Sequence, residues 1–249
     1  MHQTIDKMNQ LRLYQMAHIH HQRISQNMHS DYSVDEYAAL LVDQEWEERQ
    51  SRKMNRLIQS ARFKVHATLS DIDYKANRGL DRDMIHKLAL LSFIKQCQNV
   101  ILTGPAGVGK SYLAQALGHQ ACLNQFSTLY QITSRFLAML KFAKMDGTYL
   151  KHLNKLSRID LLILDDFGLQ NLDNVEREIL MDLIEDRHDQ KATIIASQIP
   201  ISKWYEVIGE GTIADAILDR IVHSAHRISL NGESLRKKNK PQDSKDGTA

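Results

Sequence analysis

Apolar and polar positions divide the chain into two regions with different periodicities. Residues 1–68 contain no glycine or proline and no stretch with the period-two alternation of a β-strand. Ser33 is followed three residues later by Glu36, which is the spacing of a capping box, so a helix is predicted to begin near residue 34. We therefore expect residues 1–68 to form a small all-helical N-terminal domain.

Residues 69–237 instead alternate short apolar runs with helical patterns. Runs typical of buried strands occupy residues 99–104, 127–133, 160–166, 192–198 and 225–230, and helical periodicity is found in residues 110–123, 134–157 and 175–188. Strands separated by helices of about ten or more residues pair in parallel. The pattern thus predicts an α/β domain with a parallel sheet flanked by helices, followed by a polar and disordered tail at residues 238–249.

Composition and charge set only wide limits on function. The chain has 249 residues, of which 43% are hydrophobic and 25% are charged, and its formal net charge of +2 neither requires nor excludes nucleic acid. Cys97 and Cys122 lack metal-ligand spacing and are expected to be reduced core thiols. No apolar stretch is long enough for a signal peptide or a membrane span, so we expect a soluble cytoplasmic protein with no membrane partner.

One short motif indicates a nucleotide site. The sequence GPAGVGKS, residues 104–111, fits G-x-x-x-x-G-K-[ST] in full and stands between a predicted strand and a predicted helix. Its glycines let backbone N–H groups point at phosphate oxygens, Lys110 would reach the β and γ phosphates, and Ser111 would bind the Mg²⁺ that bridges them. The predicted nucleotide-binding residues are Gly104, Pro105, Ala106, Gly107, Val108, Gly109, Lys110, Ser111 and Tyr112.

A second pattern adds two adjacent carboxylates. The apolar run LLIL, residues 161–164, ends in Asp165 and Asp166, and two like charges at the end of a buried strand need a reason to be there. In enzymes with such a phosphate loop, a neighbouring strand carries an acid that holds the Mg²⁺ shell, and a following carboxylate polarises the attacking water. We assign the metal role to Asp165 and the water role to Asp166, with capping of the next loop as the alternative for Asp166.

Three further polar residues are candidates for the same site. Gln198 ends the apolar strand 192–198, next to Ser197, and the end of this strand is predicted to lie at the same edge of the sheet as the phosphate loop. Gln198 would sense the γ-phosphate or orient water, and a solvent-facing strand end is the alternative. Arg220 would stabilise the transferring phosphoryl group of a neighbouring subunit, and Arg236 that of its own, with a surface position as the alternative for both.

The N-terminal region carries a candidate DNA-binding face. Arg49, Arg52, Lys53 and Arg56 follow helical spacing, and residues 49–64 include six basic side chains and no acidic one. Such a face would contact the phosphates of double-stranded DNA without reading bases, which predicts sequence-tolerant and salt-sensitive binding. A solvated helix face is the alternative.

These residues together resemble the AAA+ ATPases over about residues 69–237. The likeness rests on GPAGVGKS, LLILDD, IIASQ, AILDRIVHSAHRI and GESLR. More narrowly, the chain resembles the IstB-type insertion-sequence helper proteins, which are relatives of the DnaC-type helicase loaders. This second likeness rests on the upstream YAALLVDQEWEERQSRKMNRLIQSARF and on the order of elements in ISKWYEVIGEGTIADAILDRIVHSAHRISLNGESLRK.

The resemblance implies an AAA+ core that binds and hydrolyses ATP with Mg²⁺, a homo-oligomer on target DNA, and a partner transposase. It places Arg220 at the trans-acting arginine position and Arg236 at the second sensor position, whereas Gln198 stands where loaders usually have Asn. The acidic strand ends Asp-Asp rather than Asp-Glu, and the shorter Asp166 predicts slow hydrolysis, which DNA would stimulate. A DnaC-like helicase loader is the nearest alternative. A small-molecule kinase and a DNA-binding module gated by nucleotide are alternatives of other classes.

Overall fold

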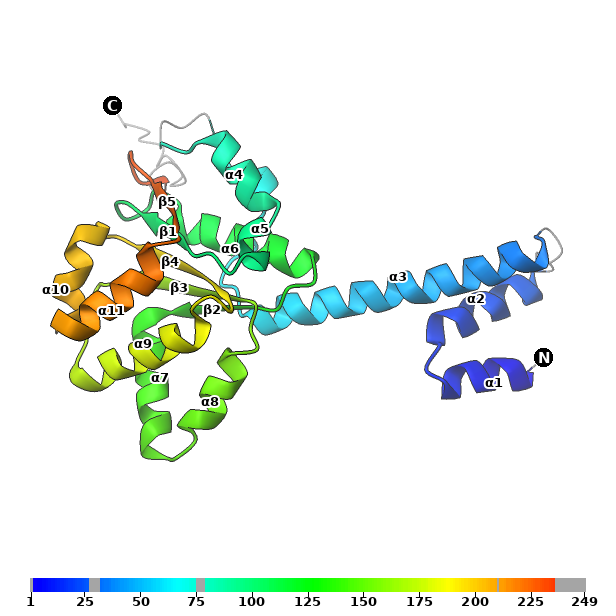
Figure 1. The fold of residues 1–249 in the computed structure, drawn as a ribbon. Coiled ribbons are helices and arrows are strands. Elements are labelled where there is room, and N and C mark those ends of the chain that lie inside the picture. The colour runs from blue at the N-terminus through cyan, green and yellow to red at the C-terminus, as the bar shows by residue number, and fades with distance from the viewer. Residues whose placement is uncertain (1, 27–31, 75–78, 210, 236–249) are drawn as a thin grey trace, which may run out of the picture. The chain divides into compact units, whose positions relative to one another are not determined.

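The computed structural model describes residues 2–26, 32–74, 79–209 and 211–235 (Figure 1). Contacts between residues divide the chain into two compact units, Met1–Arg56 and Leu57–Ala249. This limit falls inside helix α3 (Val34–Ala61). The domain boundary that the sequence indicates, between residues 68 and 69, stays a prediction.

Helices are present in the N-terminal unit, as the sequence predicts, but residues 62–68, which the prediction includes, follow the end of α3 and are not helical. The helices of the unit are α1 (His2–Gln10), α2 (Tyr14–Ser25) and the part of α3 that precedes residue 57. The predicted capping box is present, because Ser33 N donates to Glu36 Oε2 at 2.8 Å and Glu36 N donates to Ser33 Oγ at 3.3 Å. Helix α3 therefore begins at Val34, where the sequence places its start.

A buried carboxylate holds α2 against α3. Glu45, which is 3% exposed, accepts hydrogen bonds from the backbone N–H groups of Gln15 and Met16, at 2.8 and 3.2 Å, in the first turn of α2. Arg49 Nε donates to the same carboxylate at 2.8 Å. Burial alone would raise the pKa of Glu45, but Arg49 and the two N–H groups lower it. The carboxylate thus stays charged beside the positive end of α2.

The larger unit is built on a five-stranded sheet whose neighbouring strands all pair in parallel. Its spatial order is β2-β3-β4-β1-β5. The strands coincide with the five apolar runs of the sequence and are β1 (Val100–Thr103), β2 (Thr128–Ile132), β3 (Leu161–Phe167), β4 (Ala192–Ser197) and β5 (His226–Ser229). The predicted α/β class is confirmed.

Helices cover both faces of this sheet (Figure 1). Side chains alternate along each strand, so Val100 and Ile163 join the core on one face, and Ile101 and Leu162 join the core on the other. The first face packs on η2 (Leu69–Asp71), α4 (Arg82–Ala89), α5 (Ser92–Lys95) and α6 (Lys110–Leu123). The second packs on α7 (Thr133–Met145), α8 (Tyr149–Leu156), α9 (Asn174–Arg187), η3 (Ile201–Lys203), α10 (Trp204–Ile208) and α11 (Gly211–Val222). Among the helices described, none combines the length and the apolar character needed to cross a membrane.

The helical segment predicted at 134–157 is divided into α7 and α8 by a tight turn. Gly147 has a φ of 76°, and Asp146 Oδ1 accepts a hydrogen bond from Thr148 N at 2.9 Å. Glycine in a left-handed conformation beside an aspartate that bonds its own backbone is a common way to end a helix.

Both cysteines are free thiols. Cys122 is fully buried in α6, and burial raises the pKa of its thiol, whereas Cys97 is half-buried. The expectation of core thiols is therefore confirmed for Cys122, whereas Cys97 lies only partly within the core.

Candidate nucleotide-binding site

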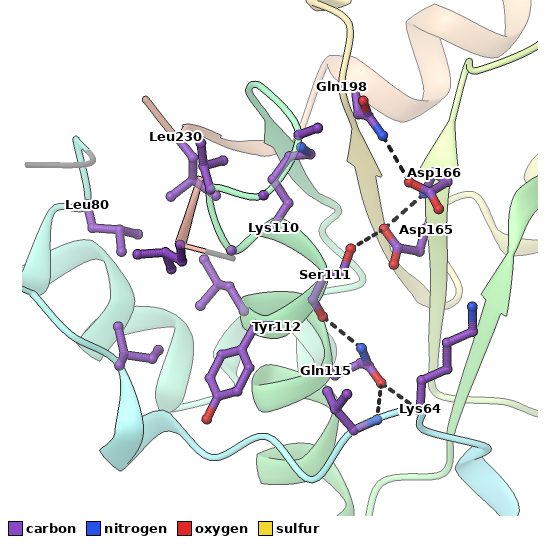
Figure 2. A pocket seen from close by; sticks show the side chains of 18 of the residues that line it. Lys64, Leu80, Lys110, Ser111, Tyr112, Gln115, Asp165, Asp166, Gln198 and Leu230 are labelled. Carbon is purple, nitrogen blue, oxygen red and sulfur yellow. Dashed lines mark hydrogen bonds between the residues drawn. The ribbon is translucent and has the colours of Figure 1, made fainter. Parts of the chain in front are cut away.

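A cavity of about 580 Å³ lies in the larger unit, where strands β1, β3 and β4 end (Figure 2). Residues 106–111 of the predicted loop and the first turn of α6 form one wall, whereas Gly104 and Pro105 are not among the residues that line the cavity. Asp165 and Asp166 from β3, together with Gln198 just after β4, form another. The structure therefore brings the predicted loop and these three predicted side chains to one place.

Glycine is needed at two positions of the loop because the backbone segment that follows β5 lies very close to them. Gly104 and Gly107 have positive φ values of 143° and 83°. A Cβ at Gly104 would lie 2.0 Å from the Leu230 carbonyl oxygen, and a Cβ at Gly107 would lie 2.1 Å from Ser234 Oγ. Leu235 N also donates to Gly107 O at 3.0 Å. The segment after β5 can therefore close against the loop only because these residues lack side chains.

Lys110 is the first residue of α6 and is 6% exposed. Its ammonium group donates to the carbonyl oxygens of Gly104 and Pro105, both at 2.7 Å, and is thereby held at the loop. The N-terminus of α6 presents backbone N–H groups and a partial positive charge at the same place. This wall can bind a polyphosphate.

Asp165 is a buried carboxylate, 2% exposed, whose two oxygens both accept hydrogen bonds. Its Oδ1 accepts from Ser111 Oγ at 3.0 Å and from Asp166 N at 2.9 Å (Figure 2), and its Oδ2 accepts from the Tyr130 hydroxyl at 2.6 Å. Thr133 Oγ1 donates to the backbone oxygen of Asp165 at 2.8 Å. The Ser111 hydroxyl and the Asp165 carboxylate are adjacent oxygen ligands of the kind that Mg²⁺ prefers, so these residues fit such an ion beside a triphosphate.

Tyr130 belongs to this site, although the sequence does not single it out. It lies in β2 and contributes to the cavity wall with a side chain that is almost fully buried. Burial raises the pKa of Tyr130 far above its usual value, and the hydrogen bond to Asp165 raises it further, so the phenol stays protonated and donates. The contact depends on the parallel pairing of β2 with β3, which no local pattern in STLYQIT reveals.

Asp166 lies at a bulge near the end of β3. The register of β3 against β4 shifts between Leu164 and Phe167, and Asp166 has a left-handed φ of 56° that is uncommon for residues other than glycine. In a regular strand, Asp165 and Asp166 would point to opposite faces of the sheet. The bulge instead lets both carboxylates line one cavity.

Gln198 and Ser197 have different surroundings at the end of β4. Gln198 lines the cavity, and its Nε2 lies 3.4 Å from Asp166 Oδ1, which is a weak hydrogen bond (Figure 2). Ser197 is fully buried, and its hydroxyl donates to Phe167 O at 2.7 Å. Gln198 is therefore the member of this pair that can contact a ligand in the cavity.

Arg220 and the phosphate loop lie at opposite ends of the strands of the sheet. Asn99 directly precedes β1, and its Nδ2 donates to the backbone oxygens of Arg220 and Ile221 at 3.3 and 3.2 Å. The loop follows the other end of β1, and four residues of strand span roughly 10 Å. The Arg220 guanidinium Nε lies 2.7 Å from Glu185 Oε2, so within one chain it is directed to α9. Arg236 lies outside the described residues.

A third wall of the cavity comes from the segment before α4 and from the end of β5, which no sequence motif indicates. Ile72, Leu80 and Leu230 line it together with Tyr112, the residue predicted from its place beside the loop (Figure 2). The Tyr112 hydroxyl lies 3.4 Å from Thr68 N. A cavity with phosphate-binding groups on one wall and apolar groups on another suits a nucleotide, whose base is flat and largely apolar.

The residues predicted to bind DNA lie in α3, in the other unit. Arg49 and Arg52 pair with Glu45 and Glu48, at 2.8 and 2.7 Å. Each acid lies four residues before its arginine and just outside the acid-free stretch 49–64, so the face is less positive than that stretch alone indicates. The Arg52–Glu48 pair is exposed and therefore weak, so a phosphate can replace the acid. The remaining two predicted residues, Lys53 and Arg56, are exposed.

The parallel sheet, the phosphate loop after β1 and the acidic end of β3 define the class of this protein as a P-loop protein with an AAA+ fold. The chain belongs to the family described as IstB-like ATP binding protein, which matches residues 6–243. The resemblance that the sequence motifs indicate is confirmed.

Relatives in this family carry names that refer to insertion sequences. A protein of Sinorhizobium fredii, named for an insertion sequence and for ATP binding, is 44% identical over 236 residues that cover 95% of this chain and 96% of its own. A Pseudomonas aeruginosa protein, named for insertion sequence IS21 and for ATP binding, is 31% identical over 240 residues, covering 96% of this chain and 91% of its own.

Solved structures of similar fold include those of DnaI and DnaA. A crystal structure of DnaI has a TM-score of 0.57 at 23% identity and covers 71% of this chain and 93% of its own. DnaA from Aquifex aeolicus, solved with AMPPCP, has a TM-score of 0.55 at 18% identity and covers 70% of this chain and 53% of its own. At these identities the comparison shows the fold alone.

The phosphate-binding wall can be tested with Lys110→Ala. The substitution removes a charged donor from the loop, which is worth about 1.5–3 kcal/mol, so the Kd for a fluorescent ATP analogue should rise about 10- to 100-fold. Lys151→Ala, at an exposed lysine of α8 away from the cavity, is the control and should leave the Kd unchanged. Equal affinities for the wild type and Lys110→Ala would contradict this assignment.

Proposed function

We propose that this protein is an ATP-dependent helper of DNA transposition. In this function it binds and hydrolyses ATP with Mg²⁺, forms homo-oligomers on double-stranded DNA, and recruits or activates a partner transposase. The observation that carries the proposal is the cavity in which the phosphate loop, Asp165 and Asp166 meet. The relatives that match this chain over nearly their full length have names that refer to insertion sequences. Residues 69–237 would form the ATPase domain, and residues 1–68 the DNA- and partner-binding domain.

Each side chain of the cavity has a role in the proposed hydrolysis. Lys110 and the N-terminus of α6 would hold the β and γ phosphates, and Ser111 and Asp165 would hold Mg²⁺, which supplies positive charge to the phosphate oxygens when bound. Asp166 would accept a hydrogen bond from the attacking water, with Gln198 beside it. Asp is one methylene shorter than the Glu of typical AAA+ sites, which favours slow turnover.

The position of Arg220 supports a homo-oligomer. Within one chain, Arg220 is near the start of β1 and the phosphate loop follows its end, so Arg220 itself could act only on a phosphoryl group held by a neighbouring subunit. Glu185 would then have to release its ion pair with Arg220 when the subunits meet. Arg236 is the second candidate arginine of the site and is proposed on the family resemblance alone.

Mixing two inactive variants tests the trans role of Arg220. Asp166→Ala should abolish turnover while leaving ATP binding intact, and Arg220→Ala should lower turnover about 1,000-fold or more. An equimolar mixture should recover part of the activity, because Asp166→Ala subunits supply the arginine to intact sites on Arg220→Ala subunits. Phosphate release with DNA present measures the recovery.

The control for this mixture is Asp166→Ala combined with Lys110→Ala. That mixture contains intact Arg220 in every subunit but no subunit with an intact site, so it should stay inactive. If the Arg220→Ala mixture is no more active than its separate components, Arg220 does not act between subunits.

Double-stranded DNA is the partner proposed for the basic face of α3. Arg52, Lys53 and Arg56 are exposed, and we expect these side chains to contact phosphates directly. Arg49 pairs with the buried Glu45. Contacts of this kind position a protein on DNA without selecting a sequence, which suits a protein that helps to choose target sites broadly.

Reversing both charges, Lys53→Glu with Arg56→Glu, should weaken DNA binding and flatten its salt dependence. Two lost phosphate contacts should reduce the slope of log K against log salt by about two. Lys87→Glu with Lys95→Glu changes the net charge equally on exposed positions of α4 and α5 and serves as the control. Fluorescence anisotropy with one duplex at several salt concentrations gives the slopes. If the control pair flattens the slope and the α3 pair does not, DNA binds to the larger unit.

A helicase loader is the second candidate function, and it rests on the resemblance of the sequence motifs to DnaC-type loaders. The two functions differ in the protein that the N-terminal region engages. We expect the full chain to capture, in the presence of ATP and DNA, the transposase encoded beside its gene, and not the replicative helicase of the same cell. Pull-down with both purified proteins in one reaction decides between them, and capture of the helicase alone would overturn the transposition proposal.

A further inference from the structure

The carboxylate of Asp165 has unlike surroundings at its two oxygens. Oδ1 faces the phosphate loop, because it accepts from Ser111 Oγ at 3.0 Å and from the following backbone N–H at 2.9 Å. Oδ2 accepts from the hydroxyl of Tyr130 at 2.6 Å. Tyr130 is 4% exposed and stands on β2, where Ile132, two residues later, is paired in register with Asp165. The strand pairing therefore fixes the phenol beside the carboxylate.

We infer that Tyr130 is a positioning residue that orients the Asp165 carboxylate for Mg²⁺ binding. This inference rests on the proposed function, since it concerns the same site. A carboxylate can rotate about its Cβ–Cγ bond and exchange its two oxygens. The hydrogen bond from Tyr130 restrains that rotation by holding Oδ2, and it leaves Oδ1 directed at Ser111, the other residue proposed for the metal.

The Tyr130 hydroxyl also compensates Asp165 Oδ2 for the loss of water on burial. At 2% exposure, solvent cannot replace a lost hydrogen bond to Asp165. Without the Tyr130 hydroxyl, the carboxylate is expected to turn toward its remaining donors, Ser111 Oγ and the backbone N–H of residue 166. This rotation would reduce its availability to a metal ion, while the phosphate loop would be unchanged.

The chain contains a matched tyrosine for comparison. Tyr149 donates from its hydroxyl to Asp182 Oδ2 at 2.7 Å, between α8 and α9. Neither Tyr149 nor Asp182 lines the cavity described above. Tyr149→Phe therefore removes a hydrogen bond of the same chemical kind at a place where no metal is proposed.

The experiment measures how much Mg²⁺ tightens nucleotide binding in Tyr130→Phe, Tyr149→Phe and the wild type. The Kd of a fluorescent, non-hydrolysable ATP analogue is determined in excess Mg²⁺ and in EDTA. Mutation of residues that orient metal ligands typically lowers metal affinity about 10- to 100-fold. The ratio of the Kd in EDTA to the Kd in Mg²⁺ should therefore be about tenfold smaller for Tyr130→Phe than for the wild type. Its Kd in EDTA should equal that of the wild type, and Tyr149→Phe should match the wild type under both conditions.

Melting temperatures of the two variants separate positioning from general stability. Both substitutions keep the aromatic ring, and both should lower the melting temperature, but only Tyr130→Phe should alter the response to Mg²⁺. Full tightening in Tyr130→Phe would overturn the positioning role, as would an equal loss in Tyr149→Phe. Absence of tightening in the wild type itself would instead contradict the proposed Mg²⁺–ATP function.

Discussion

A buried carboxylate sets the requirements that the rest of the nucleotide site meets. Asp165 is 2% exposed, and an ionised group at such burial costs several kcal/mol unless hydrogen bonds compensate it. Its donors come from three parts of the fold: Ser111 in α6, Tyr130 in β2, and the next backbone N–H of β3 itself. One charge therefore fixes the relative positions of two strands and of the helix that presents the phosphate loop.

The irregular end of β3 places the neighbouring Asp166 on the same side of the sheet as Asp165. Two successive residues of a regular strand face opposite sides of the sheet, so a regular β3 would place Asp166 against the helices of the other face. The bulge and the left-handed backbone of Asp166 avoid this, at a cost of about 1–3 kcal/mol for such a conformation. The strain is located at the residue proposed to handle the attacking water, and it allows a metal ligand and a water-binding carboxylate to be adjacent in sequence.

Local patterns in the sequence were sufficient for the strands, the phosphate loop and the acidic pair, because each is encoded within a few residues. Tyr130 could not be found in this way, since its contact with Asp165 exists only once β2 and β3 pair. The apolar wall that includes Ile72 and Leu80 likewise depends on tertiary packing. Arg49 pairs with Glu45, which lies outside the acid-free stretch 49–64. The composition of that stretch alone therefore overstates the positive charge of α3.

A second buried side chain connects the phosphate loop to the segment that follows α3. Gln115, 2% exposed, donates from Nε2 to Ser111 O at 3.0 Å and accepts from the N–H groups of Lys64 and Val65 at 2.7 and 3.2 Å (Figure 2). Because one planar amide makes all three bonds, the first turn of α6 and the backbone at residues 64–65 cannot shift independently without breaking one of them. The proposed DNA-binding face lies in α3. This amide provides a path of direct contacts from the proposed metal ligand Ser111 to the chain just beyond the end of that helix.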